Sequence, residues 1–425
     1  MYPEDYVIMK DSLIWKWVAE GFVEKKTGTS LFESGEEYFN QLINRSMIQV
    51  VESTLWQHVY ACRVHDIVLD LIRGLSDKEN FVIITNNDEG TSLSRNKVRR
   101  LAHQNRIMKQ TQQDGHMGMA QVRSLVACRC DIDSCVLHPS FKLLRVLDLE
   151  RCRVFEEGWL GLEHLGNLLH LRYLGLRHTH GIPKLPEEIG KLKFLQILGL
   201  KGSRIIVLPF SICQLTQLVC LQGGFNTCVQ DGLSLTKVTS LEELRIGISN
   251  LDEESRRQFV KNLGNLSEAR VLSIVGIWNG MVQNGAKSIV GSKTEDESNR
   301  SVAPVPVMPN LQELKFEVPV RALYKDGKGG CDNLGLECLP SLRRVTVRID
   351  CEGASSDDVG KAERELRNAA KLHSNAPTID ITRHNEKKMK RSTDREINRK
   401  VMSHRLGMKV AVTASRDDDP ATPSC

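Results

Sequence analysis

Two stretches of the sequence hold residues that could bind phosphate. Val64-His65-Asp66 places a histidine just before an expected helix, where its ring and the free N–H groups of the first turn could hold a diphosphate. Helix entry, with Asp66 as the cap and His65 partly buried, is the simpler interpretation. Residues 280–288 approach the spacing of a phosphate-binding loop, but Ala286 interrupts the required Gly-Lys-Ser. We therefore exclude a P-loop there.

No other stretch has the residues of a catalytic site. The sequence contains no GxSxG elbow, no HExxH zinc motif and no protein-kinase signature. Its 12 Cys are irregularly spaced and include no CxxC pair, which argues against a zinc site or a thioredoxin-like redox motif. We predict that the chain is not an enzyme and that it binds no metal or cofactor by itself.

Charge and hydropathy limit the partners and the compartment. The net charge is +5, and residues 386–425 hold ten Lys and Arg against six Asp and Glu, so the rest of the chain is nearly neutral. We therefore expect no nucleic-acid partner. No signal peptide and no run of about 18 apolar residues is present, so we expect a cytoplasmic protein with free thiols and no membrane span. The basic run at 387–391 could direct nuclear entry, although a solvated tail is the simpler interpretation.

Residues 1–85 are predicted to form a winged-helix-like domain. Ser12 can cap a first helix that ends at Gly21, and Ser34 with Glu37 forms a capping box for a second one. Strands at 47–51 and 59–64 follow, and Asp66 opens a third helix. Because the second helix begins with acidic residues that would repel DNA phosphates, we expect this unit to pack against a neighbouring domain.

A leucine pattern with the form LxxLxLxx(N/C) dominates the middle of the chain. Strong copies start at Leu144, Leu171, Leu195, Leu218 and Leu241, with spacings of 27, 24, 23 and 23 residues. Weaker copies extend the array in both directions. The pattern predicts an α/β fold, in which a leucine-rich-repeat solenoid with parallel strands on its concave face follows the small winged-helix domain.

The other boundaries follow from composition. We assign residues 95–352 to the solenoid, with a flexible loop near 279–309 that is rich in Gly, Ser, Asn and Pro. Residues 353–385 are expected to form a helix and a closing strand, and 386–425 a disordered charged tail. The ninth position of each repeat is small, and Cys130 and Cys152 there are interpreted as structural and buried.

The outward positions of the repeat strands are the candidate binding surface. Counting from the leucines aligns Arg129, Arg151, Arg177 and Lys201 near one edge. A solvated charged face is the simpler interpretation. The alternative is a concave docking surface for a protein partner with acidic groups, in which aromatic residues act as anchors. Its candidate residues are Arg129, Asp148, Arg151, Tyr173, Arg177, His178, Lys201, Phe225 and Arg245.

Several of these stretches resemble one family. Residues 2–6, residues 13–22 with Trp17-Val18-Ala19-Glu20-Gly21-Phe22, and residues 38–48 are similar to the winged helix of plant NB-LRR disease-resistance proteins of the coiled-coil class. Val64-His65-Asp66 matches the Met-His-Asp motif of that family, with Val in place of Met. The repeats and residues 376–381 resemble its carboxyl-terminal half.

The resemblance implies an intracellular immune receptor whose repeats sense a pathogen effector or a modified host protein. A nucleotide-binding module switches such receptors between ADP-bound and ATP-bound states, and His65 and Asp66 would contact the ADP and orient the local backbone. The P-loop of that module is missing here, so we expect nucleotide binding only with a nucleotide-binding domain supplied in cis or in trans, and no ATPase. The competing hypothesis is a generic leucine-rich-repeat scaffold or regulatory protein without nucleotide dependence.

Overall fold

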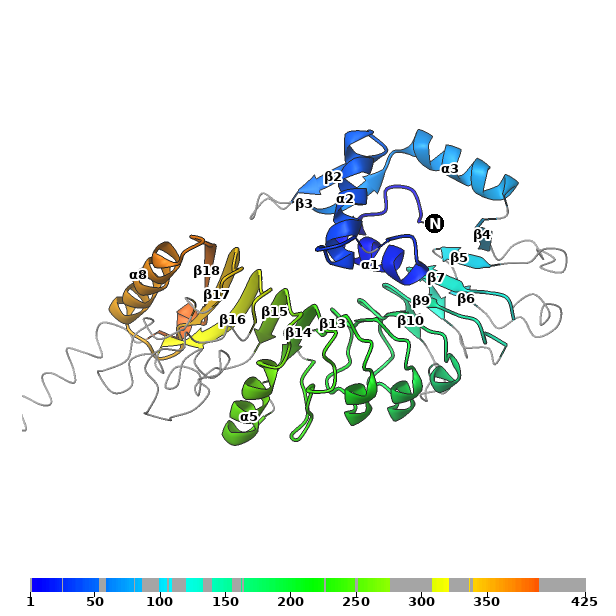
Figure 1. Ribbon diagram of the computed structural model, residues 1–425. Helices are drawn as coiled ribbons and strands as arrows, with labels where there is room; N and C mark the ends of the chain where they lie inside the picture. The colour runs from blue at the N-terminus through cyan, green and yellow to red at the C-terminus, as the bar shows by residue number, and fades with distance from the viewer. Residues whose placement is uncertain are drawn as a thin grey trace, which may run out of the picture.

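The computed structural model has two units that lie against each other, a small N-terminal domain and a curved repeat body (Figure 1). It describes residues 2–24, 26–52, 59–79, 81–85, 99–104, 107–108, 120–132, 140–154, 162, 164–224, 227–248, 251–275, 308–320, 336 and 339–389. The predicted loop at 279–309 lies outside these residues except for 308–309, and the predicted tail lies outside them beyond residue 389.

The N-terminal unit is a winged helix. Its elements are β1 (Ile8–Met9), α1 (Lys10–Glu20), α2 (Leu31–Asn44), β2 (Ile48–Glu52), β3 (Val59–Val64) and α3 (Asp66–Lys78). Its three strands pair antiparallel in the order β1-β3-β2. Gly21 ends α1 with a φ of 81°, as predicted, because a left-handed residue lets the last turn close.

The predicted caps of the first two helices are wrong. Ser12 lies inside α1 and is buried, since β1 runs directly into the helix and Met9 occupies the cap position. The capping box is formed by Ser30 and Glu33. The Ser30 backbone N–H donates to Glu33 Oε2 and the Glu33 backbone N–H donates to Ser30 Oγ, with N···O distances of 3.0 and 3.1 Å. Ser30 has the extended backbone that a cap requires, so α2 begins earlier than predicted and Ser34 is buried within it.

The repeat body is one parallel sheet, which confirms the predicted solenoid. The sheet contains β4 (Ile83–Thr85), β5 (Arg100–Gln104), β7 (Ser124–Cys128), β9 (Val146–Asp148), β11 (Tyr173–Gly175), β12 (Ile197–Gly199), β13 (Cys220–Gln222), β14 (Glu243–Gly247), β15 (Val271–Val275), β16 (Glu313–Pro319), β17 (Arg344–Asp350) and β18 (Thr378–His384), in that order. The leucines of neighbouring repeats are in register, as Leu147 with Leu174 and Leu174 with Leu198. This register stacks their side chains into one buried core.

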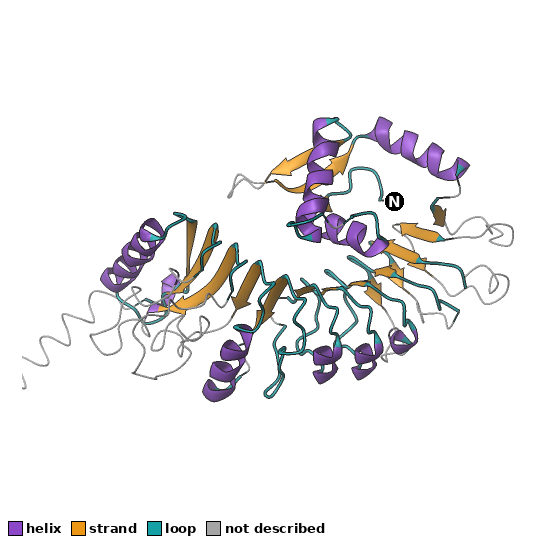
Figure 2. Cartoon of the chain, in the orientation of Figure 1, coloured by secondary structure: helices purple, strands orange, loops and turns teal. Residues whose placement is uncertain are grey.

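Helices and turns cover the convex side of the sheet (Figure 2). They include η2 (Leu165–Asn167), η3 (Glu187–Lys191), η4 (Phe210–Gln214), α5 (Glu253–Leu263) and α8 (Ser356–Leu372), and a last short turn, η7 (Glu386–Lys388), follows β18. A second small sheet contains β6 (Ile107–Met108), β8 (Asp131–Ile132) and β10 (Arg153–Val154). The helix predicted near 357–373 is α8, and the predicted closing strand is β18, paired with β17.

Small polar side chains at the ninth repeat position tie neighbouring coils together. The Thr179 hydroxyl donates to the Leu149 carbonyl at 2.7 Å, and the Cys152 thiol donates to the Ala127 carbonyl at 3.3 Å. Cys130 and Cys152 are fully buried, in line with the predicted structural role. A hydrogen bond with Cys130, together with burial, raises the pKa of the Cys152 thiol, so this sulfur stays protonated and unreactive.

Candidate protein-interaction site on the concave face

The winged helix lies on the concave face of the solenoid, with α1 placed over β9 and β11 (Figure 1). Trp15, Val18 and Ala19 of α1 are buried against Val146 and Tyr173 of these strands. Ile197, Val219 and Cys220 of the next coils extend the same apolar cluster. The outward side of these strands is therefore an interface between the two domains.

A buried ion pair lies at the centre of the interface. The Lys16 ammonium contacts the Asp148 carboxylate directly and lies 3.9 Å from the Glu150 carboxylate. These side chains are almost fully buried, and the Lys16 ammonium also donates to the Tyr2 hydroxyl at 2.6 Å. The centroids of the Tyr2 and Tyr173 rings lie 5.0 and 5.8 Å from the same ammonium. One cation from α1 thus lies between two carboxylates of the solenoid.

The protonation of this cluster follows from burial and charge together. Burial alone would lower the pKa of Lys16, but the charges of Asp148 and Glu150 together with Tyr2 and Tyr173 outweigh it, and the pKa lies well above its usual value. Burial raises the pKa of Asp148, Lys16 opposes that change, and the nearby Glu150 charge adds to it. Lys16 therefore stays charged at any physiological pH.

A hydrogen-bond network continues the interface along the sheet. The Trp15 indole N–H donates to Glu243 Oε2 at 3.1 Å, and the Gln222 amide donates to Glu243 Oε1 at 2.7 Å. Arg245 pairs with Glu243 and lies 4.0 Å from Asp11 of α1. Burial would raise the pKa of Glu243, but the Arg245 charge and these donors hold it below its usual value. Glu243 is thus an ionised acceptor for both domains.

Polar contacts hold both ends of the winged helix on the solenoid. At one end, Glu33 of the capping box accepts from Arg270 at 3.1 Å and from the Gln312 amide at 3.2 Å. At the other end, Arg100 pairs with Glu20, the last residue of α1, at 3.2 Å. The cap of α2 therefore both starts a helix and contacts the solenoid.

The predicted partner-binding residues fall into three groups. Asp148, Tyr173 and Arg177 are buried, and Arg245 is half-buried in the network described above. Arg129 and Arg151 lie 5.2 and 5.9 Å from the Tyr6 ring of the winged helix. His178 and Lys201 are exposed, and Phe225 lies outside the described residues. Binding of a separate partner by these residues stays a prediction.

The predicted row of four cations is wrong in its register. Arg129, Arg151 and His178 share one position in successive coils, where φ is 55°, 59° and 53°. Because Gly175 pairs with Asp148, Arg177 lies one position earlier in its coil, alongside Glu150, and it donates to Gln222 within the interface. The left-handed turn residues face a different direction from the strand residues, so Arg177 does not continue the row.

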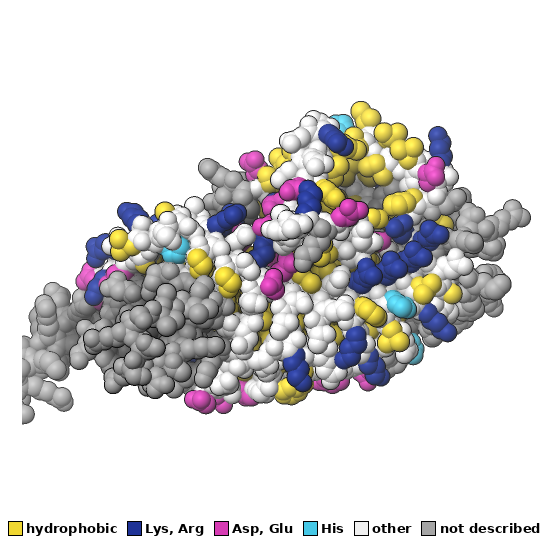
Figure 3. All heavy atoms as spheres, viewed as in Figure 1, with side chains coloured by type: hydrophobic (Ala, Val, Ile, Leu, Met, Phe, Trp, Pro, Cys, Tyr) yellow, Lys and Arg dark blue, Asp and Glu magenta, His cyan; other side chains and the backbone are white. Residues whose placement is uncertain are grey.

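Two features of the face were missed in the sequence, although both left a signal. Four outward positions at the starts of neighbouring strands are occupied by Val146, Tyr173, Ile197 and Cys220, an apolar run that indicates a covered surface. A second series of cations, Arg99, Arg123, Arg145 and Arg172, occupies the position directly before strands β5, β7, β9 and β11. Figure 3 shows Lys and Arg side chains in a row over these coils beside the winged helix. Among the described residues, no acidic side chain forms an ion pair with them.

His65 and Asp66 lie away from the concave face. His65 is the N-cap of α3 without a side-chain hydrogen bond to the helix, and both side chains are exposed. The ring and the first-turn N–H groups are free to meet an anion from another molecule. Binding of a nucleotide by these residues stays a prediction.

The described residues show neither of two common functional features. Within these parts of the chain, no three His, Cys, Asp or Glu side chains are grouped to hold a metal ion. None of the helices in the same ranges is long and apolar enough to span a bilayer.

Comparison with known proteins gives two matching family models. A leucine-rich repeat region matches residues 121–295 and 291–379, and the winged helix domain of disease resistance proteins matches residues 1–72. Neither model describes a catalytic domain. The matched ranges coincide with the solenoid and the winged helix of the structure.

Curated relatives with similar sequences come from rice and from Arabidopsis thaliana. "Disease resistance protein PIK6-NP" of Oryza sativa subsp. japonica is 34% identical over 55% of this chain and 22% of its own length. "Disease resistance protein Pik-2" of the same plant is 30% identical over 65% of this chain and 27% of its own length. "Disease resistance RPP13-like protein 4" of Arabidopsis thaliana is 29% identical over 64% of this chain and 35% of its own length. The chain spans about a fifth to a third of the length of these relatives.

Proposed function

The chain belongs to the plant NB-LRR disease-resistance family, and we propose that it is a recognition and restraint module of an intracellular innate immune receptor. In this proposal the leucine-rich repeats bind a pathogen effector or a host protein. Partner binding changes the position of the winged helix, and this change controls a nucleotide-dependent switch. The chain itself carries out no chemistry, and its output is a change of contact between two domains.

The docking of α1 on the concave face is the observation that carries this proposal. Lys16 and Trp15 of α1 cover the outward side of strands β9 to β14. A leucine-rich-repeat protein would present its binding surface on this side. A partner that binds these coils must displace α1, so recognition and release of the winged helix become one equilibrium. Because a ligand shifts such an equilibrium only through differential affinity, the partner must contact residues that α1 now covers.

The nucleotide part of the proposal rests on the position of His65. The histidine lies at the exposed start of α3, on a domain that is itself held by the solenoid. A nucleotide-binding domain in cis or in trans could contact this residue through ADP while α1 stays docked. Release of α1 would then move His65 relative to that domain, which links recognition to nucleotide exchange.

Co-precipitation with a defined panel tests the proposal. The full chain is co-expressed in leaves with each of a set of tagged pathogen effectors and candidate host proteins. We expect at least one to be captured, with stronger capture by Lys16→Met because α1 is weakened. Capture should be lost when Arg129 and His178 are both changed to Glu, since both lie on the concave side.

The matched control for these variants is Lys371→Met on α8, an exposed lysine far from the concave face in the chain. Capture should be unchanged in this variant. A partner that binds all four proteins equally well would contradict recognition through the concave face, and so would a panel without any binder.

A further inference from the structure

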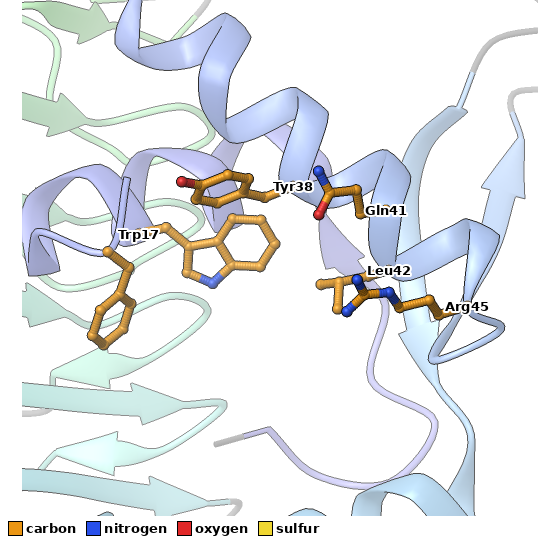
Figure 4. A pocket seen from close by; sticks show the side chains of 6 residues that line it. Trp17, Tyr38, Gln41, Leu42 and Arg45 are labelled. Atoms are coloured by element: carbon orange, nitrogen blue, oxygen red, sulfur yellow. The ribbon is translucent and has the colours of Figure 1, made fainter. Parts of the chain in front are cut away.

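A cavity of about 360 Å³ opens on the winged helix between the end of α1 and one face of α2 (Figure 4). Its lining residues are Trp17, Phe22, Tyr38, Gln41, Leu42 and Arg45. None of these takes part in the ion pairs or hydrogen bonds of the concave interface. The volume lies within the range of sites that accept a small molecule or one large side chain.

The sequence builds this cavity from two helix ends. Tyr38, Gln41, Leu42 and Arg45 recur at three- and four-residue intervals and so lie along one face of α2. The left-handed Gly21 turns the chain after α1, and the Phe22 N–H then donates back to the Trp17 carbonyl at 2.9 Å. This motif brings the residue after the glycine against the last helical turn, which places two aromatic rings on one wall.

The aromatic wall is fixed from behind. The Arg100 guanidinium lies 5.3 Å from the Phe22 ring and 4.3 Å from the Phe81 ring, and it also pairs with Glu20. Phe22 nevertheless remains 46% exposed, because its other face borders the cavity. Packing against Arg100 and Phe81 thus holds one side of the Phe22 ring, while part of the ring stays open to water at the cavity.

Arg45 gives the cavity a charged end. It is the C-cap of α2 and is exposed, and among the described residues no acidic side chain forms an ion pair with it. A free guanidinium beside aromatic rings favours a ligand with a carboxylate next to an apolar group, since Arg forms bidentate, charge-assisted hydrogen bonds with carboxylates. Aromatic residues and Arg are also the side chains most enriched where proteins bind protein segments tightly.

We propose that this cavity is a docking site for a peptide segment of a partner protein, in which an aromatic side chain is followed by an acidic residue. The aromatic ring enters between Trp17 and Tyr38, and the carboxylate pairs with Arg45. The Gln41 amide, at the rim of the cavity in Figure 4, is placed to hydrogen-bond the segment's backbone. Trp17 and Tyr38 also pack against the apolar cluster of the concave interface, so the site adjoins that interface and would add a second contact to the proposed receptor module.

The test uses the full chain labelled with ¹⁵N in its five tryptophans, whose indole N–H signals are followed by NMR. The Trp17 signal is assigned by its loss in Trp17→Phe. Three capped tetrapeptides serve as probes: phenylalanine followed by aspartate, phenylalanine followed by asparagine, and alanine followed by aspartate. We expect the first to shift the Trp17 signal and the second to bind about fivefold more weakly, because a neutral hydrogen bond replaces a charge-assisted one. The third should have no effect.

Variants separate the role of Arg45 from that of the fold. Arg45→Gln should abolish the preference for aspartate over asparagine while the aromatic peptides still shift the Trp17 signal. Arg63→Gln, which changes an exposed arginine on β3, should leave the preference intact. Unchanged Trp17 signals with every peptide, or equal affinity for the aspartate and asparagine peptides in the unmodified chain, would overturn the proposal. Equal binding of 3-phenylpropionate, which has no peptide backbone, would overturn the assignment to a protein segment.

Discussion

Lys16 of α1 and Asp148 of β9 form an ion pair that is buried between the winged helix and the solenoid. The two residues are 132 positions apart (148 − 16) in the chain, and no spacing in the sequence links one to the other. Their contact fixes which coils the winged helix covers.

Replacing Lys16 should weaken the docking more than replacing Asp148. Lys16→Met leaves two buried carboxylates, Asp148 and Glu150, without the cation that contacts them, and breaking a buried pair in this way costs about 3–5 kcal/mol. Asp148→Asn leaves Lys16 with Glu150 and the Tyr2 hydroxyl, so we expect about 1–2 kcal/mol. Denaturant unfolding and hydrogen exchange of α1 measure both. The reverse order of effects would contradict the assignment of Lys16 as the central cation.

Acid should release the winged helix through Glu33 and Glu243. Hydrogen bonds from Ser30 and Gln312 and the Arg270 charge hold the pKa of Glu33 below its usual value despite partial burial, and the pKa of Glu243 is also lowered. A carboxylate with a depressed pKa stabilises the folded form above its unfolded value of 4.5, and this contribution is lost as the pH falls through the folded pKa.

Lys16 affects stability at the alkaline end of the pH range. Because its pKa is raised, its contribution to the stability of the folded form is complete below pH 10.5 and is lost as the pH rises through its pKa in the folded form. The pKa of Asp148 is raised, so this residue destabilises the folded form as the pH rises above 3.8. Its effect in acid is therefore opposite to that of Glu33 and Glu243. The protection of α1 amides from hydrogen exchange between pH 3 and 6 should therefore depend less on pH in the double variant Glu33→Gln/Glu243→Gln than in the unmodified chain. Glu24→Gln, at an exposed site, should leave the dependence unchanged.

The chain alone should show no ATP turnover. His65 is exposed at the start of α3, and the only loop with a related spacing, at 280–288, lacks a contiguous Gly-Lys-Ser. His65→Ala should change the free energy of unfolding by less than about 0.5 kcal/mol, because the ring makes no capping bond. Phosphate release assays and isothermal titration with ADP check the expectation. Turnover by purified protein that disappears in His65→Ala would contradict it.

Thr179→Val should destabilise the solenoid while keeping its shape. The variant removes the donor to the Leu149 carbonyl at a fully buried site, which costs about 1–3 kcal/mol. Thr179→Ser keeps the hydroxyl and should cost less. Thermal unfolding compares the two, and a larger loss in Thr179→Ser than in Thr179→Val would show that the methyl group, rather than the hydrogen bond, stabilises the coil.

The second arginine series should bind acidic chains without supporting the fold. Arg145→Glu combined with Arg172→Glu should leave the free energy of unfolding within about 0.5 kcal/mol, since both side chains are partly exposed. Binding of poly-L-glutamate, followed by fluorescence anisotropy at low salt, should weaken. Arg364→Glu with Arg367→Glu on α8 is the matched control. An equal loss of poly-L-glutamate binding in the control would show that only the net charge of the chain matters, and not the position of the arginines.

The leucine period made most of the fold predictable. Leu147, Leu174 and Leu198 recur at a spacing that only a stacked coil satisfies, so the parallel sheet and its order followed from the sequence. The helices of the winged helix were also predicted, although their caps were misplaced, because Ser30 and Ser34 are both followed three residues later by a Glu.

The docking of the two domains could not be predicted by the same reasoning. An outward residue such as Tyr173 has the same place in the repeat whether it faces water or another domain. The charged residues at Lys16 and Asp148 indicate exposure when each is considered alone, and only their pairing allows both to be buried. The cavity beside Arg45 depends on the Gly21 turn, whose exit direction is fixed by packing.

The connection from α3 to β4 has a consequence for how such a module would reset. The chain leaves the winged helix and within a few residues becomes the outermost strand of the solenoid sheet, while α1 rests several coils away. A released winged helix would therefore stay tethered, at a high effective concentration near its own docking surface. A weak or transient ligand would lose this competition, and the surface would close again as soon as the ligand left.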